Sequence, residues 1–276
     1  MKKFALNLFI FLIPLSIIYY VKPLLLIQSG AYKLSVTGRE IYFSIAKSKQ
    51  KTKKRKVIIG DSVGKQLFTN DYDVDNLYSL TCNQAIGLSG HYFLLNNYFS
   101  AGNEADTVYL LFIPLSFKNN LDQVYTYQYF LKPFYNSEYK PLFTKTVFEQ
   151  IKKIPYYFLS WEPHILTSNW APSFSPKDPE DDLFISKISV EYLQLMKELC
   201  EQNNTSLILV SPPLMESEKE KIESVDHEQF KTIGLQSEFE NYFNNFIFLN
   251  DTNFMDGIHM KRPEEIRTYY LEHLIR

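Results

Sequence analysis

Residues 56–64 read Lys-Val-Ile-Ile-Gly-Asp-Ser-Val-Gly, and this stretch decides the fold. It opens with a β-branched apolar run that ends at Gly60, a pattern typical of a buried strand. Glycine permits a sharp turn at this point, and residues 62–69 can then form a helix. A buried strand that turns directly into a helix indicates an α/β domain.

The rest of the chain repeats this strand–helix unit. Further apolar strands are predicted at residues 77–82, 108–113, 206–210 and 246–249. Helices are predicted at residues 62–69, 89–99, 185–201, 217–243 (with a break near Gly234) and 263–275. Strands that are apolar throughout are typical of a parallel sheet with helices on both faces. We therefore expect a doubly wound α/β domain over residues 55–276, with ligands bound beyond the carboxyl ends of its strands.

Composition and charge exclude several classes of protein. The chain has 276 residues, 45% hydrophobic and 22% charged, which is typical of a globular protein. Its two cysteines, Cys82 and Cys200, are too few for a disulfide framework or a cysteine-rich zinc site. Residues 1–56 carry a net charge of +11 and the remainder carries −13. Because an acidic body would repel phosphate backbones, we expect no nucleic-acid partner.

Residues 1–30 are predicted to form an N-terminal membrane anchor. Lys2 and Lys3 precede an apolar run to about Ile27, which is long enough for the roughly 20 residues that a membrane span needs. A cleaved signal peptide and a buried core helix are the alternatives. The basic residues at the amino end favour a cytoplasmic N-terminus, so we expect a membrane-anchored protein whose domain is extracytoplasmic.

Residues 31–54 are predicted to be a basic linker between anchor and domain. The stretch from residue 47 to residue 56 reads KSKQKTKKRK. Such a run is either a solvated linker or a stalk that lies against anionic lipid head groups.

Residues 117–185 lack a clear strand–helix rhythm. They are rich in aromatic residues and prolines, and they include Trp161 and Trp170. We expect an aromatic-rich insertion that packs over the top of the sheet. It is either a purely structural segment with its own small core, or a lid or wall whose aromatic rings stack against sugar rings.

Side chains capable of catalysis follow the first and last predicted strands. Ser62 stands at a helix start, where N–H groups and the helix dipole stabilise negative charge, although a capping serine needs the same position. His259 has a carboxylate three residues earlier, Asp256. Such an Asp can fix the imidazole tautomer and leave the other ring nitrogen to take the serine proton, or it can simply cap a turn. Both segments follow strands, so they can meet in one cleft.

The order of these motifs resembles the SGNH hydrolase family, also called GDSL lipases and esterases. Residues 60–62 (Gly-Asp-Ser) match its first sequence block, and residues 256–259 (Asp-Gly-Ile-His) match its last. The resemblance implies a flavodoxin-like three-layer α/β fold. It also implies that Ser62 is the nucleophile, His259 the base and Asp256 the residue that orients the base.

An oxyanion hole is implied by the same resemblance. The backbone N–H groups of Ser62 and of Gly90, which lies in a loose match to the second block, would bind the developing negative charge. The third block normally reads Gly-x-Asn-Asp, but residues 114–117 read Pro-Leu-Ser-Phe. Ser116 would then replace the asparagine as a donor, with Asn119 as the other candidate. Loss of one such donor costs about 100- to 1,000-fold in rate.

The resemblance, which covers residues 55–276 outside the insertion, predicts a serine esterase or O-acyltransferase. Exported relatives with a single span often modify cell-surface polysaccharides, commonly with acetyl groups, so we expect a surface glycan or another acyl ester as substrate. A membrane acyl-donor protein is a further expected partner, and no cofactor or metal ion is expected. A lipid ester is an alternative substrate. The alternative function is a non-catalytic SGNH-fold protein that binds or assembles surface glycans, which the missing asparagine favours.

Overall fold

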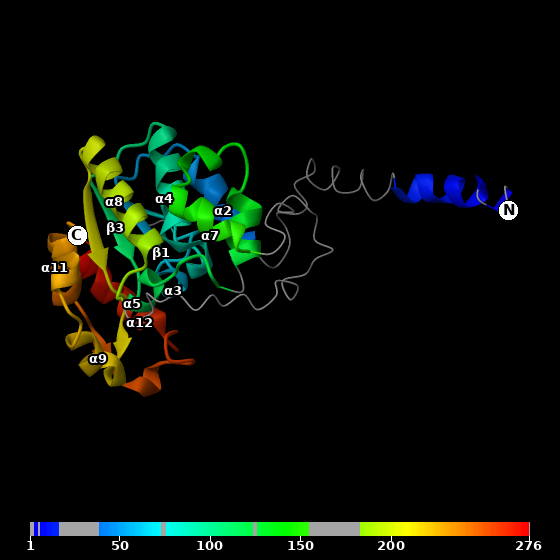
Figure 1. Ribbon diagram of the computed structural model, residues 1–276. Coiled ribbons are helices and arrows are strands. Elements are labelled where there is room, and N and C mark those ends of the chain that lie inside the picture. The colour runs from blue at the N-terminus through cyan, green and yellow to red at the C-terminus, as the bar shows by residue number, and fades with distance from the viewer. Residues whose placement is uncertain are drawn as a thin grey trace.

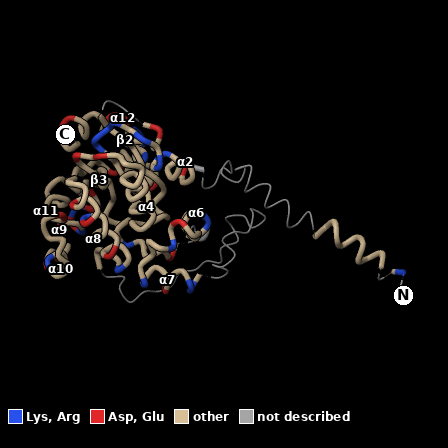
Figure 2. Tube along the Cα trace, turned by 90° about the horizontal axis from the view of Figure 1, so that it is seen from above, with Lys and Arg blue, Asp and Glu red and all other residues tan. Residues whose placement is uncertain are grey.

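The computed structural model describes residues 3–4, 6–16, 39–72, 76–123, 126–154 and 183–275 (Figure 1). Residues 6–16 are helical and carry no charged side chain (Figure 2). Over the described ranges, no helix combines the length and the apolar character needed to cross a membrane. Residues 17–30, the second half of the predicted anchor, lie outside the described residues, so the anchor stays a prediction.

A parallel sheet of four strands forms the centre of the fold. The strands are β1 (Lys56–Gly60), β2 (Leu77–Ser79), β3 (Thr107–Leu111) and β4 (Ser206–Val210), in the spatial order β2-β1-β3-β4. Val57 of β1 lies opposite Tyr78 on one side and Val108 on the other. The predicted parallel sheet is thereby confirmed.

The last predicted strand is present but does not extend the main sheet directly. β6 (Phe248–Leu249) pairs in parallel with β5 (Leu214–Met215), which follows β4 after a short break. Pro212 and Pro213 stand in that break. Proline has no N–H to donate to a sheet, so the two prolines end the pairing with β3 before β5 begins to pair with β6.

Helices cover both faces of the sheet, which gives the three layers visible in Figure 1. Alternate strand residues face opposite cores: Val57 and Ile59 belong to one core, and Ile58 belongs to the other. The first core is covered by α2 (Arg39–Ser48), α4 (Gly87–Ser100), α8 (Lys187–Gln202) and α11 (Gln236–Asn244). The second is covered by α3 (Ser62–Leu67), α12 (Pro263–Tyr269) and the π-helical turn η9 (Tyr270–Leu274).

Helix α2 differs from the basic linker predicted over residues 31–54. Ile41 is fully buried in the first core. The Ser44 hydroxyl and the Lys47 ammonium both donate to backbone carbonyl oxygens of the domain. The linker prediction treated the lysines as solvated, whereas the residues before them form an amphipathic helix that packs on the body. The folded domain therefore begins no later than Arg39.

The described part of the predicted insertion packs beside the helical layer and joins the first core. It contains η3 (Tyr127–Leu131), α6 (Lys132–Phe134), η4 (Lys140–Leu142) and α7 (Lys145–Lys152). Phe93 of α4 contacts the rings of Phe130, Phe134, Tyr139 and Phe143. These aromatic rings are therefore structural, and they do not line a surface for sugars. Residues 155–182, with Trp161 and Trp170, lie outside the described residues.

The predicted helical stretch 217–243 is divided into three short helices. They are α9 (Lys219–Glu223), α10 (Glu228–Thr232) and α11, and 3₁₀ turn η7 (Glu216–Glu218) precedes them. Gly234 has φ +71°, a left-handed conformation that ends α10, as the sequence predicts. The remaining short elements are η2 (Gln84–Ile86), α5 (Pro114–Phe117) and η8 (Asp251–Asn253).

A buried carboxylate joins the ends of β1 and β3. Asp61 is fully buried and caps α3, accepting from the N–H groups of Val63 (2.9 Å) and Gly64 (3.0 Å). Its second oxygen accepts from the Ile113 N–H (2.9 Å) and the Ser116 hydroxyl (2.6 Å). Burial raises the pKa of the Asp61 carboxyl, and these hydrogen bonds oppose the rise. The residue therefore fixes the turn that carries Ser62.

Two glycines let β3 approach this turn closely. A Cβ atom at either Gly60 or Gly64 would lie 2.7 Å from the carbonyl oxygen of Leu111, which is too close for any other residue. The N–H of Asp61 donates to that same carbonyl oxygen at 3.2 Å. The Gly-Asp-Ser-Val-Gly stretch is therefore shaped by its contact with β3.

We expect Asp61→Asn to lower the free energy of unfolding by about 1–3 kcal/mol, because its amide cannot accept on both sides and leaves a buried N–H unpaired. Asp61→Ala, which removes all four hydrogen bonds, should cost more. Urea unfolding of the full chain measures both effects. Asp71→Asn, at an exposed position, is the control and should change stability by less than about 0.5 kcal/mol. An unchanged midpoint for Asp61→Asn would contradict the proposed role.

Candidate active site

Ser62 occupies the first position of α3, at the carboxyl end of β1. Its side chain is partly exposed. The N–H of a first helical residue has no acceptor within its own helix. The Asp61 carboxylate, which caps the helix, accepts from the N–H groups of Val63 and Gly64 and not from that of Ser62. The Ser62 N–H therefore lies at the free end of α3, and its role as an oxyanion donor stays a prediction.

Asp256 and His259 form a tight turn after β6. One carboxylate oxygen of Asp256 accepts from the His259 N–H (2.8 Å), and the other lies 2.8 Å from His259 Nδ1. Gly257, between them, has φ +86°, which the turn requires and which side chains rarely adopt. The His259 backbone N–H and then its side chain lower the pKa of the Asp256 carboxyl to about 2. Asp256 is therefore an anion that holds the Nδ1–H tautomer of the ring.

The two predicted segments meet across the sheet. His259 Nε2 lies 3.2 Å from Ser62 Oγ, within reach for proton transfer. Asp256, His259 and Ser62 thus form one continuous chain of contacts, although 197 residues separate the serine from the histidine. The imidazole is about one quarter exposed, so a substrate can approach from solvent. This arrangement has the connectivity of a serine-hydrolase triad.

Gln66 holds the histidine turn in place, a role that the sequence analysis missed. Its amide oxygen accepts from the Met260 N–H at 3.0 Å, and its amide nitrogen lies 3.5 Å from the Met260 carbonyl oxygen. Gln66 stands four residues after Ser62 on α3, so both side chains lie on one face of the helix. That i, i+4 spacing is the sequence signal that was available. The same helix therefore positions Ser62 and contacts the residue that follows His259.

The other predicted oxyanion residues are engaged elsewhere. Gly90 lies inside α4, where its N–H faces the carbonyl of the capping residue Ile86, and a Cβ at Gly90 would lie 2.6 Å from the Ile86 side chain. The Ser116 hydroxyl donates to Asp61, and the Asn119 amide donates to the Gln84 carbonyl at 2.6 Å. The structure thus differs from the predicted oxyanion hole at two residues. The Gly90 N–H lies inside α4, and the Ser116 hydroxyl donates to the Asp61 carboxylate.

A different side-chain amide, that of Gln84, lies beside this cluster. Gln84 is partly exposed on η2, and its Oε1 lies 3.5 Å from Ser116 Oγ. Ser116 in turn contacts Asp61, the residue before Ser62. Gln84 follows the second strand and directly precedes the segment in which the sequence analysis assigned a glycine donor. No local motif marks it, because its position depends on contact with Ser116, 32 residues away.

His91 is fully buried behind the nucleophile turn. Its two ring nitrogens lie 2.7 Å from the carbonyl oxygens of Gly87 and Gly60. The carbonyl contacts favour the charged ring, but burial outweighs them and lowers the pKa of His91 to about 4. The neutral ring donates from one nitrogen only. His91 therefore links the first turn of α4 to the end of β1 and is not a base for substrate.

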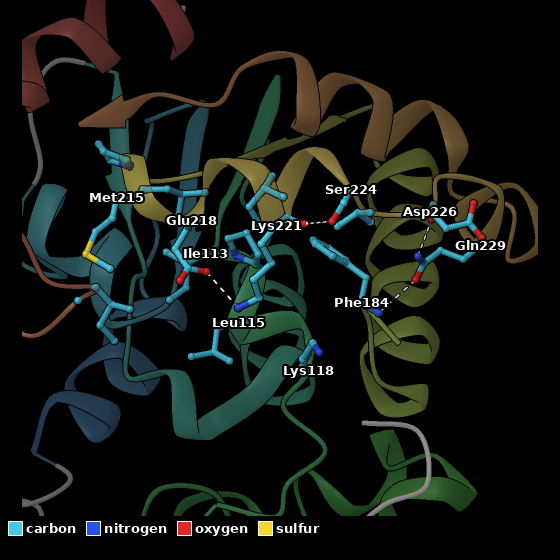
Figure 3. Close-up of a pocket in the computed structure, with 17 residues that line it drawn as sticks. Ile113, Leu115, Lys118, Phe184, Met215, Glu218, Lys221, Ser224, Asp226 and Gln229 are labelled. Carbon is cyan, nitrogen blue, oxygen red and sulfur yellow. Dashed lines mark hydrogen bonds and ion pairs between the residues drawn. The ribbon is translucent and has the colours of Figure 1, made fainter. Parts of the chain in front are cut away.

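A cavity of about 520 Å³ lies next to the residues that follow β3 and β4 and borders Gly257 and Ile258 (Figure 3). Its walls come from α5, β5, α9 and the turn that carries His259. Most of the lining is apolar, and it includes Ile113, Leu115, Phe184, Met215 and Ile258. The cavity is a feature that the sequence analysis did not predict.

Comparison of the chain with protein-family models, with curated proteins and with solved structures finds no match. The chemistry of the site is therefore argued from its own geometry.

We expect His91→Phe to destabilise the protein by about 1–3 kcal/mol near neutral pH, because a buried hydrogen bond is lost. Since the pKa of His91 falls from 6.5 to about 4 on folding, the unfolded chain binds more protons between these values. Wild type therefore loses stability relative to His91→Phe as the pH falls from about 6.5 to about 4. Urea unfolding at several pH values measures this difference.

His273→Phe, which removes an exposed histidine, is the matched control. A difference between wild type and His91→Phe that grows on acidification would mean that the buried ring is charged, and it would contradict the expected pH dependence.

Proposed function

We propose that the chain is a serine esterase or O-acyltransferase that uses Ser62, His259 and Asp256. The observation that carries the proposal is the continuous contact from Asp256 to His259 Nδ1 (2.8 Å) and from His259 Nε2 to Ser62 Oγ (3.2 Å). A helix cap alone does not require a histidine beside the serine, and a turn alone does not require Nε2 to point at a hydroxyl. The combination supports nucleophilic catalysis.

The geometry suggests the following steps. Ser62 Oγ attacks the ester carbonyl carbon while its proton passes to His259 Nε2. The negative charge on the former carbonyl oxygen is bound by the Ser62 N–H and, in our proposal, by the Gln84 amide. His259 then gives its proton to the departing alcohol, which leaves an acyl group on Ser62. Water or an acceptor hydroxyl, deprotonated by His259, attacks this acyl-enzyme and frees the serine.

The assignment to the SGNH hydrolases and the biological setting are part of the same proposal. The three-layer α/β fold and the motifs at the ends of its first and last strands support an SGNH-type, flavodoxin-like domain. With the predicted anchor at residues 1–30, the domain would be extracytoplasmic. Cell-surface polysaccharide is the proposed acceptor or substrate, and a membrane acyl-donor protein is a proposed partner of the transferase.

A non-catalytic protein that binds or assembles surface glycans is the second candidate. The observation that favours it is the engagement of the Gly90, Ser116 and Asn119 donors within the fold. An oxyanion hole with the Ser62 N–H alone would be weak.

Covalent labelling separates the two candidates. We expect a fluorophosphonate to add once to the full chain, because His259 activates the Ser62 hydroxyl, and intact mass measures the adduct. Ser62→Ala and His259→Ala should both abolish it. Ser237→Ala, which removes an exposed serine in the first turn of another helix, should keep it. A folded wild-type chain without an adduct would favour the binding protein.

Gln84→Ala should lower kcat for p-nitrophenyl acetate by about 100- to 1,000-fold with little change in KM, since the amide acts in the transition state. Steady-state kinetics and urea unfolding of the same samples separate catalysis from folding. Gln194→Ala, which removes an exposed amide on α8, is the control. A rise in KM at constant kcat would instead make Gln84 a ground-state contact.

A further inference from the structure

The cavity that borders Gly257 and Ile258 shares its walls with the catalytic segments. Ile258 lines the cavity and directly precedes His259. Ile113 lines it too, and its N–H donates to Asp61, the residue before Ser62. The backbone of the cavity wall is therefore hydrogen-bonded to Asp61 and continuous with the segment that carries His259.

Polar groups in the cavity are largely satisfied by one another (Figure 3). Glu218 and Lys221 form an ion pair at 3.1 Å. The Gln229 side chain donates to the Asp226 carbonyl oxygen and accepts from the Phe184 N–H. These groups thus have protein partners already, and a ligand that needed new hydrogen bonds would have to displace them.

The larger part of the surface left for a ligand is apolar. Ile113, Pro114, Leu115, Leu214, Met215 and Ile258 contribute to it. Leu115, which lines the cavity, is 55% exposed, so an apolar side chain of the lining also reaches solvent. Aliphatic walls suit a hydrocarbon chain, whereas a sugar requires hydrogen-bond partners and aromatic faces. An acetyl group would leave most of a cavity of about 520 Å³ unfilled.

We propose that this cavity binds the acyl chain of the ester, and that this chain is longer than acetyl, because a cavity of about 520 Å³ is of the size that holds an ordinary small-molecule ligand. The inference rests on the proposed function and deepens it. It replaces the acetyl group expected from the resemblance with a longer acyl group, and it leaves the acceptor alcohol on the open side of Ser62.

The test is the acyl-length profile of the full chain with p-nitrophenyl acetate, butyrate, hexanoate and octanoate. Because each buried methylene contributes about 0.8 kcal/mol, kcat/KM should rise about fourfold per added methylene until the cavity is full. A profile that falls steadily from acetate would overturn the inference and leave the esterase proposal standing. Faster hydrolysis of octyl acetate than of ethyl octanoate would also overturn it, since the cavity would then hold the alcohol.

Val225→Trp tests whether the acyl chain lies in this cavity. Val225 lines the far part of the cavity, away from the segments that carry the triad. The added ring should reduce the octanoate-to-acetate ratio of kcat/KM at least tenfold. Glu201→Trp, at an exposed site at the end of α8, is the size-matched control and should keep the wild-type ratio. An unchanged ratio in folded Val225→Trp would place the acyl chain elsewhere.

A binding measurement separates failure of this inference from failure of the proposed function. Octanoate should bind Ser62→Ala in calorimetry, acetate should bind at least tenfold more weakly, and Val225→Trp in the same background should weaken octanoate binding. If the wild-type chain hydrolyses no ester and forms no fluorophosphonate adduct, octanoate binding still supports an alkyl-chain cavity. Absence of octanoate binding in that case would overturn both proposals.

Discussion

The carboxylate of Asp61 is the constraint on which the rest of the site depends. A fully buried carboxylate is costly unless donors surround it, and Asp61 has four: three backbone N–H groups and the Ser116 hydroxyl. Two of the N–H groups belong to the first turn of α3 and the third belongs to the segment after β3. Satisfying one side chain therefore fixes the ends of two neighbouring strands relative to each other. Ser62 and the cavity wall at Ile113 take their positions from that single interaction.

Helix α3 carries this constraint to the base. It begins with Ser62 and, one turn later, presents Gln66 to the backbone of Met260. The turn of Asp256 and His259 is short and partly exposed, and its own hydrogen bonds do not connect it to the strand that precedes Ser62. Gln66 makes the connection between them. The triad is thus assembled by one six-residue helix that is held at its start by Asp61.

Sequence reasoning succeeded where the signal is local and failed where it is not. Strand β4 was predicted with the bounds that the structure gives, because a run of apolar residues is a local signal. The three-residue spacing of Asp256 and His259 is equally local. Gly90 was misplaced because α4 begins at Gly87, whose φ of +60° lets η2 lead directly into the helix, two residues before the predicted start. Helix boundaries are the least predictable part of an element. Here a start two residues earlier than predicted places the Gly90 N–H inside the helix instead of at its free end.

Some residues that line the cavity belong to the segments that hold Asp61 and His259 in place. This overlap determines which residues could change to alter the preferred acyl length. A substitution at Ile113 or Ile258 alters the cavity, but it also moves the backbone that carries the donor to Asp61 or the base. The segment around α9 and α10 carries no member of the triad and forms the opposite wall. Variation in acyl length would therefore be accommodated by that segment at little cost to catalysis. In the proposed enzyme, the site thus separates into a side built on Asp61, which would carry the catalytic residues, and a wall that could change with the substrate.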